Sequence, residues 1–265
     1  MHQRLEYNNA MSDLPHLTVP LDHPEVVRPR PAGFVYGNVL KLFESHMKTM
    51  TTKVEELRQW IDSEALKKVP DERVNDTEPY WNNDYFSGDD ARVAYALLRL
   101  HRPAAIVEIG SGNSTKFFRK GISEGYTKTK LVSIDPEPRA EITRIADTVF
   151  KQSVLSVDLR LFAAMAANDI LFLDGSHLSF NSTDTTHFFL EILPVIKPGV
   201  LVHIHDIMLP NEYDAEFTRR GYNEQYLLAT LLLYSKEWIP LLPVHYLSQR
   251  NILSNGGVSF WMIRL

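Results

Sequence analysis

Cysteine is absent from the chain of 265 residues. Without thiols there are no disulfides, no zinc–thiolate or iron–sulfur sites and no thiol nucleophile. No stretch approaches the roughly eighteen consecutive apolar residues of a membrane span, and residues 226–234, the best run, are too few. Residues 1–11 lack the apolar segment of a signal peptide. These absences predict a cytoplasmic protein with no membrane partner.

Basic residues are not in excess, since 28 Lys and Arg face 33 Asp and Glu, for a net charge of −5. This balance gives no electrostatic reason to expect nucleic acid as a partner. Hydrophobic residues make up 44% and charged residues 23%, as in folded globular proteins. The length accommodates one large α/β domain, or a domain with a substantial extension.

The N-terminal third carries no chemical motif but has a clear organisation. Five prolines between Pro15 and Pro31 predict an extended, largely non-helical arm. Residues 38–68 then show the period of a long helix. Its apolar side chains recur at alternating steps of three and four: Leu40, Phe43, Met47, Met50, Val54, Leu57 and Ile61. Such a stripe packs on its own domain, forms the seam of a homodimer or higher homo-oligomer, or covers an active site as a lid.

An aromatic segment follows, with Tyr80, Trp81, Tyr85 and Phe86 within seven residues. Aromatic side chains at this density form either a hydrophobic plug or the wall of a pocket. The next helical pattern ends before a proline, at residues 89–102, and Asp89 or Asp90 is the residue expected to cap its N-terminus.

From residue 104 short apolar runs alternate with helical patterns. The predicted strands are 105–109, 131–134, 149–150, 170–173 and 200–204. The predicted helices between them are 114–122, 139–146, 159–167 and 185–196. Continuous apolar strands separated by helices predict a doubly wound parallel sheet buried on both faces. A helix at 224–234 and two antiparallel strands, 239–247 and 258–263, joined through a glycine-rich turn, complete the chain.

Ligands of open α/β sheets bind at the carboxyl ends of the strands, so polar residues there are the candidate site. After the first strand, Gly110 and Gly112 permit close backbone approach, and Ser114 is able to cap the next helix. Asp135 closes the second strand, where a carboxylate can accept hydrogen bonds from a ribose. Together these residues predict a site for an adenosine-containing ligand.

Two further groups end the fourth and fifth strands. Asp174 and His177 belong to one, and His203, His205 and Asp206 to the other. Strand alternation places both histidines of the second group on one face and Asp206 on the other. His203 lies further inside the strand, as expected of a structural histidine, whereas the other four residues should converge at the rim. Such a cluster suits a divalent cation, or a general base beside an anchoring carboxylate.

Six motifs in this order resemble the class I S-adenosylmethionine-dependent methyltransferases, specifically a small-molecule group with a Glu-Ile-Gly-Ser-Gly-x-Ser-Thr turn. They are Ile106–Thr115, Ile134–Pro136, Leu173–His177, Lys197–Gly199, His205–Ile207 and Asn223–Leu228. The resemblance covers residues 83–265. It implies a Rossmann-like seven-stranded sheet of order 3-2-1-4-5-7-6 with the last strand antiparallel. It also implies a methyltransferase domain at 104–265, preceded by an extension at 1–103 that caps the site, forms an oligomer, or both.

The resemblance implies S-adenosylmethionine as the cofactor and a role for each matching position. The methionine moiety would be lined by the first turn, the ribose held by Asp135, and the adenine approached by the residues after the third strand. Asp174 would face the methionine ammonium group or a metal. The implied cofactor-binding set is Glu108, Gly110, Ser111, Gly112, Ser114, Asp135, Gln152, Ser153 and Asp174.

Metal-dependent O-methyltransferases of this fold hold Mg²⁺ or another divalent cation with two carboxylates and an asparagine. Asp174 and Asp206 match the carboxylates, but Ile207 stands in place of the asparagine. The resemblance therefore implies a metal site at Asp174, Asp206 and His205, in which His205 or His177 must substitute for the missing ligand.

The resemblance implies O-methylation of a hydroxyl on a small-molecule acceptor, a sugar or a natural-product intermediate. A sulfonium methyl group is already activated, so alignment and removal of the acceptor's proton are what the protein must supply. His205 is the first candidate for the base or metal neighbour, His177 the second, with Asp174 beside them.

Three alternatives stay open. An NAD-dependent oxidoreductase would share the glycine turn and Asp135 but leaves Asp174 and His205–Asp206 unexplained. A metal-dependent hydrolase would use the histidine and aspartate cluster without needing Asp135. A non-catalytic methyltransferase-like protein would act through its N-terminal helix.

Overall fold

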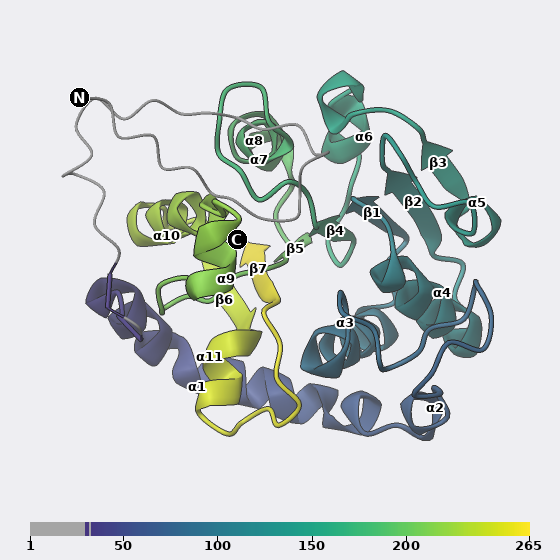
Figure 1. Ribbon diagram of the computed structural model, residues 1–265, viewed down its shortest axis with the longest axis horizontal. Coiled ribbons are helices and arrows are strands. Elements are labelled where there is room, and N and C mark those ends of the chain that lie inside the picture. Colours follow the sequence, from purple (N-terminus) through teal and green to yellow (C-terminus); the bar gives the residue numbers. More distant parts are fainter. Residues whose placement is uncertain (1–29, 32) are drawn as a thin grey trace. The chain divides into compact units, whose positions relative to one another are not determined.

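The computed structural model describes residues 30–31 and 33–265 of the chain. Most of the predicted proline-rich arm, 15–29, lies outside the described residues. Residues 32–265 form one compact unit, and the elements within it are labelled in Figure 1. The description below concerns this unit alone.

A seven-stranded sheet of order β3-β2-β1-β4-β5-β7-β6 is the centre of the unit. Its strands are β1 (Ala105–Ile109), β2 (Lys130–Ile134), β3 (Thr148–Phe150), β4 (Ile170–Leu173), β5 (Leu201–Ile204), β6 (Trp238–Pro243) and β7 (Phe260–Arg264). The first five run parallel, and β7 runs antiparallel to both β5 and β6. The predicted Rossmann-like fold and its reversed last strand are thus confirmed.

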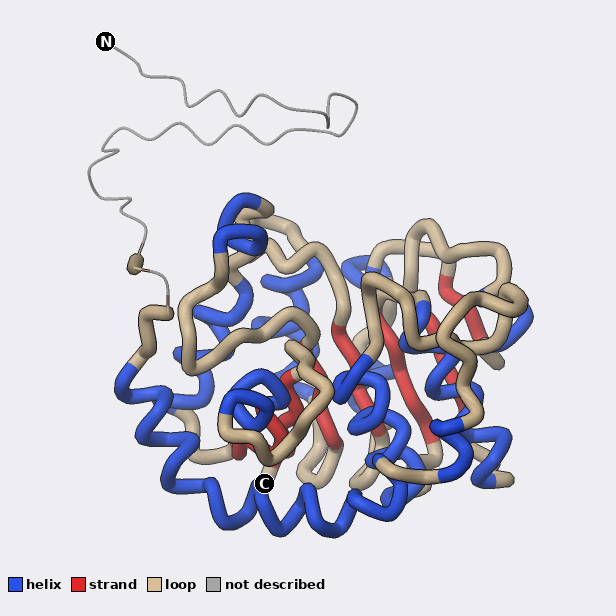
Figure 2. Tube along the Cα trace, turned by 60° about the horizontal axis from the view of Figure 1, so that its bottom comes forward, coloured by secondary structure: helices blue, strands red, loops and turns tan. Residues whose placement is uncertain are grey.

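The parallel strands are apolar because helices cover both faces of the sheet, as Figure 2 shows with strands in red and helices in blue. Every residue of β4 and β5 is buried. The register pairs Ile109 with both Ile134 and Leu173, and Leu173 with Ile204. The ends of four strands therefore lie level, which brings the residues that follow them to one edge.

Helices in the second half of the chain follow the predicted alternation. They are α4 (Asn113–Gly125), α5 (Ile142–Ile145), α6 (Arg160–Ala163), α7 (Asp184–His187), α8 (Leu193–Val195), α9 (Ala215–Arg219), α10 (Glu224–Tyr234) and α11 (Val244–Gln249). The helices expected at 139–146 and 159–167 are only single turns. The one expected at 185–196 contains a π-helical turn at Phe188–Ile192 just before Pro194, whose ring nitrogen has no proton for the regular helix bond.

The long helix α1 (Gly37–Ile61) lies along the unit and packs on α3 (Gly88–His101), β6 and α10. It ends seven residues earlier than predicted, because Asp62 and Ser63 leave the helical conformation and Ser63 precedes the short helix α2 (Glu64–Lys67). Phe43, Met50, Val54 and Leu57 of its apolar stripe are fully buried. The stripe therefore packs on the chain's own domain, and a homo-oligomer formed through α1 would have to use its other face.

Asp89 and Asp90 do not cap α3, which begins at Gly88 after Ser87. Both carboxylates are buried and accept hydrogen bonds from the loop that leads into β7. Asp89 accepts from the backbone and side chain of Asn255, at 2.7 and 3.0 Å, and Asp90 from the backbone of Ser259 at 2.7 Å. The expected capping role is wrong because these tertiary contacts take both carboxylates away from the helix end.

The strand predicted at 239–247 is also corrected. β6 ends at Pro243, and the chain turns directly into α11. β6 is an edge strand with a register shift between Pro240 and Leu242, which is where a sheet tolerates proline. The two antiparallel strands are therefore joined through a helix before the glycine-rich segment 255–257.

Among the described residues, no helix combines the length and the hydropathy needed to cross a lipid bilayer.

The burial of the α1 stripe can be tested by Leu57→Ala. Leu57 is fully buried, so the truncation should lower the free energy of unfolding by about 3 kcal/mol. Urea denaturation followed by circular dichroism measures it. The matched control is Glu55→Ala on the exposed side of α1, expected to change stability by less than about 0.5 kcal/mol. Dissociation of an oligomer by Leu57→Ala without loss of monomer stability would contradict the packing.

Candidate functional site

The turn after β1 lies against the end of β4. Gly110 has a φ of +79°, and a Cβ added there would lie 1.9 Å from the carbonyl oxygen of Asp174. Only glycine accommodates both the backbone conformation and this approach. The predicted need for close backbone contact is therefore real at Gly110, whereas a Cβ at Gly112 would meet nothing within 4 Å.

Glu108 is fully buried and anchors the start of α4. It accepts hydrogen bonds from the hydroxyls of Ser114 and Thr115, the latter at 2.6 Å, while the Thr115 hydroxyl also accepts from the backbone N–H of Gly112 at 3.0 Å. Burial raises the pKa of the Glu108 carboxyl to about 8, against the opposing effect of the two hydroxyls. A carboxyl group at the proposed methionine subsite is thus protonated at neutral pH.

Asp135 and Ser111, which the sequence assigns to one ligand, contact each other. The Asp135 carboxylate accepts from the backbone N–H of Ser111 at 3.0 Å and from its hydroxyl at 2.7 Å. It also accepts from the backbone of Glu137 at 2.9 Å. These bonds fix the carboxylate beside the glycine turn.

Gln152 and Ser153 follow β3 and are exposed. The side-chain amide of Gln152 donates to the carbonyl of Ser156 at 3.1 Å, and the Ser153 hydroxyl accepts from the backbone of Leu155 at 3.3 Å. Both side chains therefore form hydrogen bonds within their own loop. That they lie near the adenine remains a prediction.

His177, after β4, lies between three carboxylates. Its Nε2 is 3.5 Å from Asp174 Oδ1 and 3.4 Å from Asp206 Oδ2. Its Nδ1 is hydrogen-bonded to Glu224, at the start of α10. Asp174, His177 and Asp206 each offer a ligand atom within 4.8 Å of the others, so the predicted convergence of these residues is observed.

His205 approaches the same two aspartates from the other side. Its Nδ1 is 3.2 Å from Asp206 Oδ1 and 3.8 Å from Asp174 Oδ1, and its Nε2 is 3.5 Å from Asp90 Oδ2. The ring is 4% exposed and lies 5.4 Å from the ring of Phe86. The sequence places His205 at the rim, but the structure buries it beneath the aromatic segment.

The alternation predicted at the end of β5 holds for His203 and His205, whose stacked rings have centroids 5.7 Å apart, but fails for Asp206. The strand ends at Ile204, and Asp206 has a φ of +54°, so its carboxylate turns towards His205 instead of the opposite face. His203, within the strand, is buried, stacked on Phe172 and hydrogen-bonded to the Ser259 hydroxyl at 2.8 Å. His203 is therefore structural, as predicted.

Carboxylates outnumber imidazoles two to one in this cluster, so it is negative even when both imidazoles are charged. No Lys or Arg among the described residues pairs with Asp90, Asp174, Asp206 or Glu224. Burial opposes charge on both imidazoles, but the carboxylates prevail: Glu224 and Asp174 raise the pKa of His177, and Asp174, Asp206 and Asp90 raise the pKa of His205. Burial likewise opposes charge on Asp174, yet the two imidazoles hold the pKa of Asp174 at about 2.

Aromatic side chains of the loop after β5 stand beside His177. The Tyr222 ring centroid is 4.3 Å from that of His177, and Phe217 stacks on Tyr222 at 5.2 Å. The residues of the aromatic segment at 80–86 lie in different environments. Trp81 and Phe86 pack on Phe117 of α4, whereas Tyr85 is exposed.

Asp90 and Glu224 are the two residues of the cluster that the sequence did not assign to it. Glu224 belongs to the segment Asn223–Leu228 that carries the family resemblance, but helix position alone does not reveal its contact with His177. Asp90 has the sequence pattern of a helix cap. Both approach the cluster from helices distant in sequence, which is why local spacing gives no signal for either.

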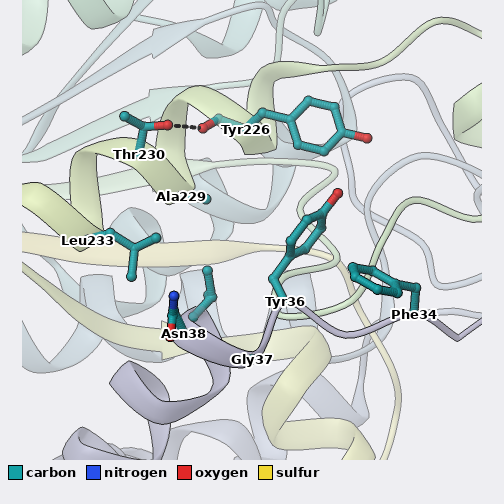
Figure 3. Close-up of a pocket in the computed structure, with 9 residues that line it drawn as sticks. Phe34, Tyr36, Gly37, Asn38, Tyr226, Ala229, Thr230 and Leu233 are labelled. Carbon is teal, nitrogen blue, oxygen red and sulfur yellow. Dashed lines mark hydrogen bonds between the residues drawn. The ribbon is translucent and has the colours of Figure 1, made fainter. Parts of the chain in front are cut away.

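Two cavities lie away from the cluster. One, of about 350 Å³, separates residues 34–39 from α10, and Figure 3 shows Tyr36, Tyr226 and Leu233 around it. The other, of about 720 Å³, lies between α2 and the start of α3, beside Trp81 and Arg92. Neither is lined by a predicted cofactor or catalytic residue.

The protonated state of Glu108 predicts a pH-dependent difference in stability. Its folded pKa of about 8 is above the ordinary value of 4.5, so the folded state binds the extra proton and stability falls as pH rises from 4.5 towards 8. Glu108→Gln removes this proton uptake. Its stability relative to wild type should rise between pH 5 and pH 9 by an amount on the order of a few kcal/mol, measured by chemical denaturation. A pH-independent difference would contradict the raised pKa.

Comparison with known proteins gives one family match and several similar folds. The model of a methyltransferase-domain family matches residues 107–207. No curated protein shows significant sequence similarity. Among solved structures, cmcI-N160 with SAH is 18% identical with a TM-score of 0.42, covering 79% of this chain and 91% of that one.

The SAH-bound methyltransferase PaMTH1 from Podospora anserina is 12% identical with a TM-score of 0.42, covering 90% of this chain and 98% of that one. The cofactor-bound protein Rv0187 from MTB is also 12% identical, with a TM-score of 0.43 and coverage of 90% and 99%. The matched domain runs from β1 to just beyond β5 and contains the glycine turn, Asp135, Asp174 and Asp206. The match of residues 107–207 to a methyltransferase-domain family and the observed strand order are both consistent with the resemblance to class I S-adenosylmethionine-dependent methyltransferases.

Proposed function

We propose that the protein transfers the methyl group of S-adenosylmethionine to a hydroxyl of a small-molecule acceptor. The observation that carries this proposal is the pair of His177 and Glu224 beside Asp174 and Asp206, at the ends of β4 and β5. In an open α/β sheet this is the edge at which ligands bind. The pair supplies a proton acceptor where the family domain would place the cofactor's reactive end.

The cofactor would occupy the edge formed by β1, β2 and β4. Its methyl group, carried on a sulfonium, is already activated for displacement. Gly110 lets the backbone approach closely, Asp135 is held ready for the ribose by Ser111, and Asp174 would face the methionine ammonium group. The fit is supported by charge, since a cationic cofactor is favoured beside a cluster rich in carboxylates.

His177 has the arrangement of an oriented base. Its Nδ1 is bonded to the buried carboxylate of Glu224, which fixes the ring and leaves Nε2 facing Asp174 and Asp206. A carboxylate bonded to one imidazole nitrogen holds the ring in place and stabilises the imidazolium that forms when the other nitrogen takes a proton. Methyl transfer to a hydroxyl releases one proton, and His177 Nε2 would accept it.

A divalent cation fits the same cluster. The carboxylates of Asp174 and Asp206 offer donor atoms within 4.8 Å of each other beside His177, and the cluster is otherwise short of positive charge. The cation would lower the pKa of a bound hydroxyl. Positive charge beside Asp174 and Asp206 would also weaken the effect that raises the pKa of His177, so that the imidazole can be neutral near pH 7.

The wall beside His177 indicates the acceptor class. Tyr222 and Phe217 stack there, and Tyr213, 5% exposed, packs edge-on against Phe217 and Tyr222. Flat aromatic faces bind sugar rings or planar natural-product intermediates by apolar contact. We assign the acceptor to one of these two classes.

Cofactor selectivity gives the first test. In a thermal-shift titration, S-adenosylmethionine and S-adenosylhomocysteine should raise the melting temperature, because each binds only the folded state. NAD should leave it unchanged at the same concentration. Stabilisation by NAD alone would favour the oxidoreductase alternative and contradict the proposal.

The base assignment predicts the effect of His177→Ala. Transfer of labelled methyl groups from S-adenosylmethionine to a panel of glycosides and phenolic compounds should fall by at least about 100-fold, because general-base catalysis contributes that much or more. Affinity for S-adenosylhomocysteine, measured by calorimetry, should stay within about threefold.

Glu224→Gln should reduce turnover less than His177→Ala, because the amide still accepts or donates a hydrogen bond at Nδ1 but no longer stabilises the imidazolium. The matched control is His101→Ala. His101 bonds to Asn168 at the opposite end of the sheet, and its replacement should leave turnover unchanged. Full activity of His177→Ala would exclude His177 as the base.

A further inference from the structure

Arg92, in the second turn of α3, is a cation held in a fixed position. Its Cζ lies 4.5 Å from the centre of the Trp81 ring, and its Nη1 donates to the carbonyl of Ile61 at 3.2 Å. Trp81 is itself packed on Phe117, with the ring centres 5.2 Å apart. The aromatic face and the carbonyl stabilise the guanidinium charge in part, but its Nε has no hydrogen-bond partner among the described residues.

The charge of Arg92 also lacks a carboxylate, in contrast to two similar arginines. Arg99 and Arg264 each lie over a tryptophan ring and each reach an acidic side chain. The distance from Arg99 to Glu124 is 3.9 Å, and that from Arg264 to Glu237 is 2.8 Å. Within the described part of the chain, Arg92 forms no such ion pair and has only its carbonyl and ring contacts. A partly buried charge without an opposite charge is costly, so an anion from outside the chain would stabilise it.

The guanidinium of Arg92 lines the larger of the two cavities, of about 720 Å³. Lys67 and Lys68, at the end of α2, also line it, and Asp71 is the one acidic residue of the lining. Lys67 is bonded to Glu64 at 2.7 Å, whereas Lys68 is exposed and forms no ion pair with a described residue. Three cations and one carboxylate make the lining positive on a chain with a net charge of −5. Such a concave positive surface concentrates anions.

Neutral groups complete the lining at the start of α3. Ser87 and Gly88 belong to it, and the Ser87 hydroxyl caps no backbone N–H of the helix. The N-terminus of a helix adds partial positive charge. Asn255 lines the cavity as well, and its backbone and side-chain amide already satisfy the buried carboxylate of Asp89, at 2.7 and 3.0 Å. Asp71 is therefore the one lining charge that opposes an anion.

We propose that this cavity is a binding site for an oxyanion of the phosphate type, either free phosphate or the phosphate group of a small molecule. The planar guanidinium of Arg92 suits two oxygens of one phosphate, and Lys68 adds a charge on a flexible stem. The volume lies in the range of small-molecule sites, which favours a phosphate ester over the free ion. The site is separate from the cluster at the strand ends and does not depend on the proposed methyl transfer.

Calorimetry on the full-length protein tests the site, with inorganic phosphate, glucose 6-phosphate and glucose as probes. Both phosphates should bind, and glucose should not. Tighter binding of glucose 6-phosphate identifies an ester as the source, and tighter binding of inorganic phosphate identifies the free ion. No binding of either phosphate at millimolar concentration would overturn the proposal, as would equal affinity for glucose and glucose 6-phosphate.

The titrations are repeated with S-adenosylhomocysteine present, because a phosphate could otherwise bind at the cofactor edge. Affinity for phosphate should be unchanged. Competition between S-adenosylhomocysteine and phosphate would place the anion at the cofactor edge and overturn the assignment to this cavity. A protein that binds phosphate but not S-adenosylhomocysteine would contradict the proposed function and leave the anion site standing.

Substitutions in the lining identify the residues that hold the anion. Arg92→Gln should weaken phosphate binding by at least about 10-fold, because charge-assisted hydrogen bonds are lost. Arg92→Lys keeps the charge without the planar fork and should recover part of that loss. Lys68→Gln changes an exposed side chain and should weaken binding by about threefold, which tests the site even if a variant of Arg92 fails to fold. Unchanged affinity in both Arg92→Gln and Lys68→Gln would overturn the proposal.

Arg99→Gln is the matched control. It removes the same charge from an arginine that also lies over a tryptophan but does not line the cavity. Its affinity for phosphate should stay within about twofold of wild type, since surface charges at a distance are largely screened. An equal loss in Arg99→Gln and Arg92→Gln would indicate a general effect of net charge and overturn the site. Melting curves show which variants are folded, and phosphate should raise the melting temperature of wild type more than that of Arg92→Gln.

Discussion

The site depends on one constraint. Its carboxylates lie close together with too few positive charges to balance them. Asp90, Asp174, Asp206 and Glu224 surround two imidazoles, and no Lys or Arg among the described residues pairs with them. Removing carboxylates from water costs several kcal/mol each unless opposite charges and hydrogen bonds compensate. Protons on the imidazoles, or a bound cation, must supply that compensation.

This charge constraint explains why segments outside the matched domain contact the strand ends of that domain. The matched domain covers 107–207, yet Asp90 comes from α3 before it and Glu224 from α10 after it. Glu224 is hydrogen-bonded to His177, Asp90 lies 3.5 Å from His205 Nε2, and the loop before β7 closes over Asp90 with backbone N–H groups. The N-terminal extension thus contributes a charged residue to the site as well as covering the sheet. For this reason the predicted domain boundary at residue 104 divides the sequence motifs but not the structure, because residues on both sides of it form the cluster.

Strand and helix periods predicted a doubly wound parallel sheet with an antiparallel ending, and the family resemblance implied its strand order. The same reasoning placed Gly110, Asp135, Asp174 and His177 at the strand ends, where position along a parallel strand fixes position in space. It failed for Asp206, since alternation holds only while the chain stays extended, and Asp206 has left the strand with a φ of +54°. It also failed for Asp89 and Asp90, because helix-capping preferences are local, whereas their partners at 255–259 lie more than 160 residues away.

Proton binding and cation binding are linked at this edge of the sheet. The carboxylates raise the pKa of both imidazoles, so without another positive charge the site binds protons. A metal ligand must release its proton to coordinate, and metal binding at such a site expels protons. A cation held by Asp174 and Asp206 would thus replace protons at this edge of the sheet and lower the pKa of the neighbouring imidazoles.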